Sequence, residues 1–179
     1  VTMPTPTERT ALKRALEAVW NGDAKMVCNM LYVNSTVNVN AVDPVGTGGM
    51  TLLMHAAFFN QVGVVSVLLR HPRINVWRKD AHGRTAFAQT FTHTKSDAFI
   101  TMLKDPRVDL EDTIETGENA FQFKCRLGFI SDVKILLKLR NLDINTKSSK
   151  GMYPLMSAIA GNVLGTNSGM ERAAIVKVL

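Results

Sequence analysis

The sequence has few of the residues on which several classes of protein depend. Its 179 residues include two cysteines, Cys28 and Cys125, which are too few for a disulfide framework and favour a reducing compartment. No stretch approaches the roughly 18 apolar residues of a membrane span, and the N-terminal residues lack an apolar signal core. Since 46% of the residues are hydrophobic and 20% are charged, the chain is not of the disordered class. We therefore expect an ordered, soluble protein of the cytoplasm or nucleus.

Residues that commonly carry chemistry are sparse or poorly spaced. No two of the four histidines stand at metal-ligand spacing, and neither cysteine has a base beside it in the sequence. The acidic residues between Asp109 and Glu115 span an expected extended segment and a turn, so nothing holds two carboxylates at an acid–base distance. The glycine-rich stretch 46–49 lacks the lysine of a phosphate-binding loop. We predict no catalytic residue, no metal site and no cofactor, and hence a protein that is not an enzyme.

What the sequence does contain is a period of 34 residues. The segments that open at Thr51, Thr85 and Asn119 align without gaps, and their apolar residues fall into columns. One column holds Leu53, Phe87, Phe121 and Leu155, and another holds Leu69, Leu103 and Leu137. A repeat of this size indicates a stacked array, in which each unit buries its apolar face against its neighbours.

One unit can be followed residue by residue. Residues 80–83 (DAHG) predict a turn, and the Thr85 hydroxyl can cap a short helix over 86–92. A break precedes a second helix over 97–103, which must end before Pro106 because proline lacks the amide donor. The unit therefore consists of a turn, a helix, a second turn, a second helix and an extended return.

The pattern D-x-x-G-x-T-A-F-A from Asp80, an apolar helix ten residues later, the returns I-N-V and V-D-L, and the run TLLMHAA from Thr51 together resemble the ankyrin repeat. The resemblance implies an all-α solenoid of about five helix-turn-helix repeats with β-hairpin tips, after an N-terminal tail over 1–7. The expected repeats cover approximately 8–42, 43–79, 80–113, 114–147 and 148–179. We expect the array to continue beyond Leu179, since an apolar helical edge follows an extra segment at 163–171.

Three positions depart from the pattern of that family. Residues 47–49 lengthen the tip that follows Asp43, and Ile114 replaces the aspartate that usually opens the turn. Trp77 stands where the family often has an asparagine.

The resemblance also implies where a partner would bind, namely on a concave face made from the tips and the first helices. Mapped column by column, the candidate residues are Trp20, Phe58, Phe59, Lys79, His82, Arg84, His93, Arg126 and Lys150. Aromatic and arginine side chains supply much of the energy at interface centres. We predict recognition of another protein, through a segment with one apolar anchor and acidic flanks.

Three alternatives stay open. Phe58 and Phe59 could pack between adjacent first helices instead of facing a partner. The bases between Arg70 and Arg84 could bind nucleic acid or another polyanion, although the acidic run 111–118 interrupts them and speaks against nucleic acid. The array could also recruit a substrate for an enzyme that lies elsewhere in a longer chain.

Overall fold

The computed structural model describes residues 5–34, 37–43, 48–91, 97–139, 142–160 and 175–177. The chain divides into two compact units. Unit 1 comprises Val1–Thr90 and Ser96–Val108, and unit 2 comprises Phe91–Lys95 and Asp109–Leu179. The described residues are mostly helical and contain no β-strand, only the isolated bridges Val42–Thr51 and Thr113–Asn119. The expected β-hairpin tips are therefore not confirmed in the described part of the chain, where two of them carry a single antiparallel bridge each.

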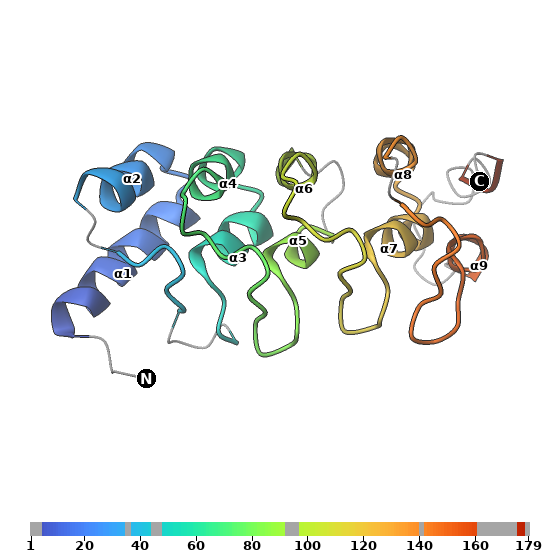
Figure 1. Cartoon of the computed structure of the whole chain (residues 1–179), viewed down its shortest axis with the longest axis horizontal. Coiled ribbons are helices and arrows are strands. Elements are labelled where there is room, and N and C mark those ends of the chain that lie inside the picture. Colours follow the sequence, from blue (N-terminus) through green and yellow to red (C-terminus); the bar gives the residue numbers. More distant parts are fainter. Residues whose placement is uncertain are drawn as a thin grey trace. The chain divides into compact units, whose positions relative to one another are not determined.

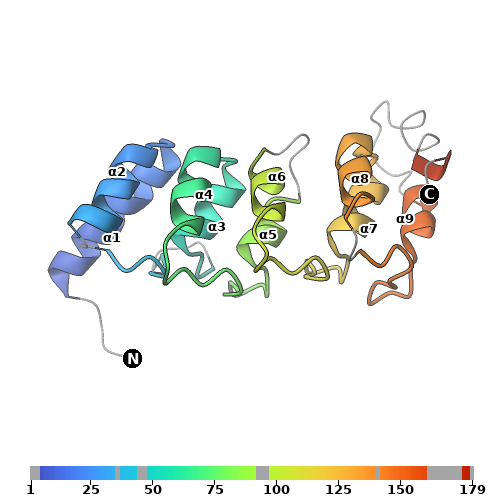
Figure 2. The same ribbon diagram turned by 45° about the horizontal axis from the view of Figure 1, so that its top comes forward.

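Unit 1 consists of helices in two layers (Figure 1). The helices are α1 (Pro6–Trp20), α2 (Ala24–Cys28), which continues as the π-helix η1 (Asn29–Val33), α3 (Leu52–Phe58), α4 (Val62–Leu69), α5 (Ala86–Gln89) and α6 (Asp97–Leu103). The helices α1, α3 and α5 pack in succession in one layer, and α2, α4 and α6 form the other. Figure 2 shows α3 and α4 side by side, as expected for one helix-turn-helix repeat.

Unit 2 contains α7 (Ala120–Leu127), α8 (Ile130–Leu136) and α9 (Pro154–Ala160) (Figure 1). The helix α7 packs against both α8 and α9. The extra segment 163–171 and the added tip residue Thr47 lie outside the described residues. The boundaries between the five expected repeats stay predictions.

Two helix ends differ from the sequence-based expectation. The helix α1 begins at Pro6, inside the segment 1–7 expected as a tail, because Thr5 and Glu8 form a reciprocal capping box. The helix α5 ends at Gln89, earlier than predicted for 86–92. The Thr90 hydroxyl donates a hydrogen bond of 2.6 Å to the Phe87 carbonyl, and such side-chain bonds compete with continuation of the helix. The second helix of this unit, 97–103, is confirmed.

The helices α3, α5 and α7, which are the first helices of their repeats, begin in the same way in both units. The side chains of Thr51, Thr85 and Asn119 each accept a hydrogen bond from the backbone N–H three residues later. These caps satisfy amide groups that have no partner within the helix. The cap predicted at Thr85 is therefore confirmed. Caps one period earlier, at Thr51, and one period later, at Asn119, begin α3 and α7 in the same way.

The turn before each capped helix keeps its geometry when its first residue changes. In unit 1 the Asp80 N–H donates to the Arg84 carbonyl at 2.9 Å, and in unit 2 the Ile114 N–H donates to the Glu118 carbonyl at 3.0 Å. Gly117 takes a φ of 70°, a left-handed conformation that glycine adopts without strain. The loss of aspartate at 114 therefore leaves the turn intact.

The core is offset from one of the two apolar columns that the sequence shows. Leu53, Leu68 and Leu136 are all buried. In the second column, however, Leu69, Leu103 and Leu137 are half-buried, while Leu68, Met102 and Leu136, one residue earlier, are fully buried. The buried face of the second helices, α4, α6 and α8, is thus offset by one residue from the column that the alignment suggested.

Candidate partner-binding surface

Three large aromatic side chains of unit 1 lie at the C-terminal ends of α1 and α3. Trp20 ends α1, and Phe58 and Phe59 end α3; they are 45%, 43% and 46% exposed. The rings of Phe58 and Phe59 meet edge to face with centroids 5.2 Å apart. We call Trp20, Phe58 and Phe59 the aromatic cluster. Phe58 and Phe59 are therefore partly exposed rather than buried, and the rest of each residue is covered by its neighbours.

A buried histidine contacts two members of the aromatic cluster, Trp20 and Phe59. His55, on α3, is buried, and its ring lies parallel to that of Phe59 with centroids 6.4 Å apart. The indole Nε1–H of Trp20 donates to His55 Nδ1 at 3.4 Å. On the other side of the ring, His55 Nε2 lies 3.2 Å from Asp43 Oδ2. An accepting Nδ1 assigns the proton to Nε2, so the neutral ring links the exposed indole to a buried carboxylate.

The electrostatics of this contact favour neutral histidine. Burial lowers the pKa of His55, and the field and hydrogen bond of Asp43 oppose that shift only in part. The end of α1 is held separately, because the Gln61 side-chain amide donates to the Trp20 carbonyl at 3.0 Å. His55 therefore has a structural role, which includes positioning Trp20.

The predicted basic residues of unit 1 differ in their exposure. The guanidinium of Arg84 contacts the buried Asp80 through Nε and Nη2, each 3.1 Å from Oδ2. That carboxylate compensates the charge of Arg84. Lys79 and His82 are exposed. His82 belongs to a tip that packs against the preceding one, where the Ala81 N–H donates to the Gly48 carbonyl at 2.6 Å.

Glycine at position 48 suits this packing between tips. Gly48 has a φ of 66°, and a Cβ there would lie 3.3 Å from the His82 ring. The additional glycines of this tip thus allow its backbone to approach the next loop.

The remaining candidates belong to unit 2 or lie outside the described residues. Arg126 forms a two-pronged ion pair with Glu118, with Nε to Oε1 at 2.8 Å and Nη2 to Oε2 at 3.0 Å. Its guanidinium also lies over the Phe123 ring. Lys150 is exposed, and His93 lies outside the described residues. The structure therefore brings together the aromatic cluster, whereas Arg84 and Arg126 are tied to carboxylates of their own units.

Sequence reasoning missed two features. Lys124 of α7 is fully buried, 2.9 Å from Asp132 Oδ2 and over the Phe129 ring. Burial lowers the pKa of Lys124, and Asp132 opposes the shift. Trp77 is 59% exposed, more than any aromatic residue of the candidate set. The available signals were a lysine in a buried column, one period after the buried Thr90, and a tryptophan at a position that the family usually gives to asparagine.

The described residues offer no evident site for chemistry. Burial raises the pKa of the Cys125 thiol to about 12, so that it stays protonated near neutral pH. Cys28 is exposed. No group of three or more metal-ligating side chains gathers in the described part of the chain. None of the helices in that part is both long and apolar enough to cross a membrane.

Comparison with known proteins supports the resemblance. Residues 48–81 match the family model of the ankyrin repeat, and this stretch runs from the tip glycines through α3 and α4 to the next turn. The chain thus carries an ankyrin repeat, a kind of unit that generally serves in protein–protein interaction. No curated protein shows a significant match to the chain.

Proposed function

We propose that this chain is a non-catalytic module that binds another protein, with the aromatic cluster as the main contact. The observation that supports this is three half-exposed aromatic side chains around the buried His55, which contacts both Trp20 and Phe59. Aromatic side chains that are already positioned lose little conformational entropy on binding, and such residues dominate the energy of many interfaces.

The partner segment would present an apolar side chain to the cluster. Its acidic flank would meet Lys79 and His82, which are the exposed basic candidates of unit 1. Arg84 contributes less in this proposal because Asp80 already compensates its charge. Arg126 and Lys150 are assigned a weaker contact made by unit 2, and the role of His93 stays a prediction.

Affinity capture from a lysate of source cells tests this proposal. The baits are the native chain, the Phe58→Ala/Phe59→Ala variant and the control Ile144→Ala, which removes an exposed apolar side chain from unit 2. A protein retained by the native chain and by the control, but not by the double variant, supports the aromatic cluster. Equal capture by all three baits contradicts it. Circular dichroism establishes beforehand that each bait is folded.

A further inference from the structure

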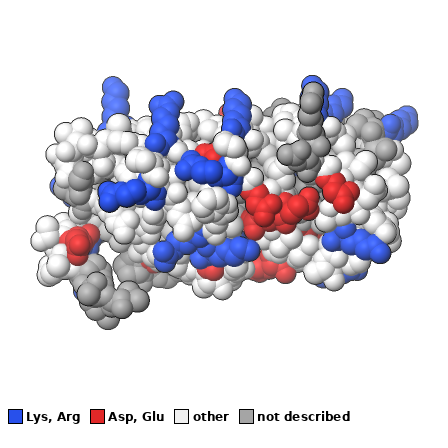
Figure 3. Space-filling view, viewed as in Figure 1, with Lys and Arg blue, Asp and Glu red and all other residues white. Residues whose placement is uncertain are grey.

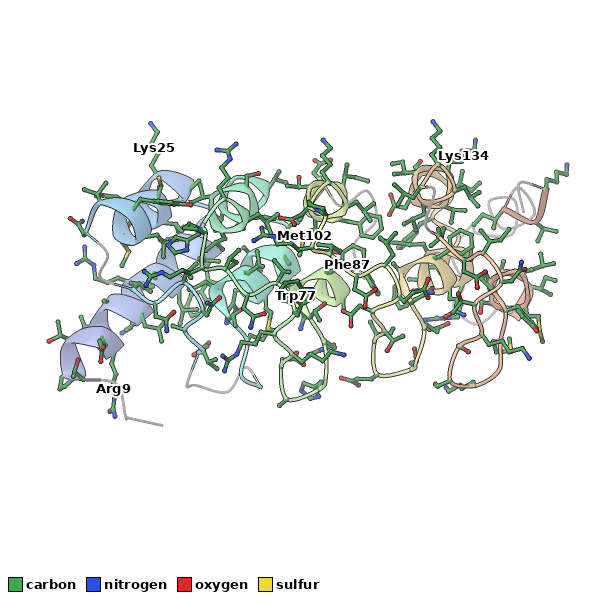
Figure 4. All side chains as sticks on the ribbon, viewed as in Figure 1. Arg9, Lys25, Trp77, Phe87, Met102 and Lys134 are labelled. Carbon is green, nitrogen blue, oxygen red and sulfur yellow. The ribbon has the colours of Figure 1, made fainter. Side chains whose placement is uncertain are left out.

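The segment 70–79, which leads from α4 toward α5, combines an exposed indole with a concentration of positive charge. It reads RHPRINVWRK, with four arginine or lysine residues and no acid. Ile74 and Val76 are buried and anchor its backbone to unit 1. Between these anchors and the tip, Trp77 is 59% exposed (Figure 4). The side chain of Trp77 thus projects from a fixed backbone rather than filling the core.

The arginines of this segment lack the carboxylates that hold other arginines of unit 1. Arg84 is paired with Asp80, and Arg107 with Asp105. By contrast, the exposed guanidinium groups of Arg70, Arg73 and Arg78 have no hydrogen bond and no ion pair among the described residues. Their charge is therefore uncompensated, and Figure 3 shows basic side chains on the face of unit 1 in the view in which Figure 4 labels Trp77.

The same segment one period later shows that the repeat does not require this composition. Trp77 and Arg78 correspond to Glu111 and Asp112 at 34-residue spacing. The acidic run 111–118, which interrupts the basic residues in the sequence, belongs to unit 2. The concentration of bases in 70–79 is therefore a property of unit 1 that the fold leaves free to vary.

We propose that the segment 70–79 binds single-stranded nucleic acid, with Trp77 stacked on a base and Arg73 and Arg78 bound to flanking phosphates. Guanidinium groups match phosphate oxygens with paired hydrogen bonds, and an exposed indole offers its face to a planar base. An acidic protein segment would use the charge but would need an aromatic side chain placed beside its carboxylates, whereas every nucleotide carries a planar base next to its phosphate. This site uses none of the residues of the aromatic cluster, so it stands or falls independently of the proposed protein partner.

Fluorescence titration with a single-stranded oligonucleotide of about 12 nucleotides, within the usual range of such sites, tests the proposal. The chain has two tryptophans, Trp20 and Trp77, which single substitutions distinguish. Stacking predicts that the oligonucleotide quenches the emission of the native chain and of Trp20→Phe, but not that of Trp77→Phe. Absence of binding, or equal quenching with Trp77→Phe, overturns the proposal.

A charge variant and a matched control test the phosphate contacts. The Arg73→Gln/Arg78→Gln variant should bind at least tenfold more weakly, and the slope of log K against log salt should fall by about 0.7 for each phosphate that the variant no longer neutralises. The control Lys134→Gln/Lys138→Gln removes two exposed charges from unit 2 and should change the affinity less than twofold. Equal weakening by the two variants overturns the proposal, because it indicates a nonspecific effect of net charge.

Two competitors separate nucleic acid from other polyanions. Polyglutamate that displaces the oligonucleotide at an equal concentration of charge would point to acidic protein as the ligand and overturn the proposal. A duplex of the same length that binds as tightly as the single strand would also overturn it, because paired bases are not free to stack on Trp77. Preference for the single strand over both competitors supports it.

Discussion

The segments 70–79 and 104–113 occupy the same place in successive periods of the chain but differ in how their charges are used. Both contain an arginine at the same step, Arg73 in the first and Arg107 in the second. Arg107 is held by Asp105, with Nη2 to Oδ2 at 2.6 Å, and donates to the Leu69 carbonyl at 2.7 Å. Position 71, one period before Asp105, is a histidine. A single acidic residue thus turns a surface arginine into part of the scaffold, and its absence leaves Arg73 available.

The buried polar pairs of the two units show a second contrast. Unit 1 buries His55 beside Asp43, and unit 2 buries Lys124 beside Asp132. The histidine can stay neutral and reaches an exposed tryptophan, whereas the fully buried lysine ends against its acid and the Phe129 ring. In unit 1 the buried polar side chain therefore hydrogen-bonds to an exposed residue. In unit 2 it pairs with a buried carboxylate.

The largest effect is expected where the interior pair of unit 2 is broken. Lys124→Ala should lower the free energy of unfolding by about 3–5 kcal/mol, because Asp132 is left buried without its cation. Urea unfolding followed by circular dichroism measures the change. The exposed Lys134→Ala should alter it by less than about 0.5 kcal/mol. A decrease below about 1 kcal/mol for Lys124→Ala would show that the pair stabilises unit 2 little.

Core truncation should affect the two units alike. Leu68→Ala in unit 1 and Leu136→Ala in unit 2 should each cost about 2–5 kcal/mol, since both side chains are fully buried. The neighbouring Leu69→Ala should cost distinctly less because Leu69 is only half-buried. Thermal unfolding of the three variants ranks them. If Leu69→Ala were the most costly, the column of the sequence alignment, rather than the offset column, would form the core.

The buried histidine of unit 1 predicts a dependence of stability on pH. Because burial lowers the pKa of His55, the unfolded chain takes up the proton more readily than the folded one. Stability should therefore be full above the ordinary histidine pKa of about 6.5 and decline as the pH falls below it. His71, whose pKa is also lowered by burial and by Arg73, contributes in the same direction.

Melting temperatures between pH 8 and pH 5 check this prediction, with His55→Gln and His71→Gln as separate variants. His55→Gln should flatten the profile more than His71→Gln, since the ring of His55 is the more enclosed of the two. The emission of Trp20 should change over the same pH range only when His55 is present, because protonation of Nδ1 removes the acceptor of its indole. An identical profile for the native chain and His55→Gln would show that His55 does not titrate as proposed.

The smallest effect is expected at the arginine of segment 104–113. Asp105→Asn removes the charge that holds Arg107, and the cost should be about 0.2–1 kcal/mol because the guanidinium is partly exposed. Chemical denaturation at low and at high salt measures the difference, which should shrink as salt screens the native pair. A larger decrease that does not depend on salt would assign the stabilisation to the hydrogen bond with Leu69 rather than to the ion pair.

Much of the local structure was predictable because it depends on neighbours in the chain. The helix 97–103, the cap at Thr85 and the buried Cys125 follow from apolar spacing and from residue type. The end of α5 at Gln89 was not foreseen. The Thr90 hydroxyl can bond to the backbone of the preceding turn or leave the helix to continue, and only the packed chain shows that it bonds to the Phe87 carbonyl.

The candidate surface was predictable only in part. The aromatic cluster could be identified because large apolar residues stand at columns that are commonly polar or small. Its attachment to His55 could not, because the contact joins residues 35 positions apart. The ion pair of Arg126 could not be predicted either, because Glu118 lies eight residues away and sequence spacing gives no sign that the turn brings them together.

The local residue pattern determined the order of the helices, their caps and the periodic core, since caps and apolar spacing act within a few residues. Which charges face solvent unpaired, and which groups are buried, depended on the tertiary structure. Ion pairs and burial require side chains from separate turns to meet, and their strength depends on the water that packing removes. Arg73 and Arg107 stand at the same step of the repeat, yet Arg107 is held in the scaffold and Arg73 is not.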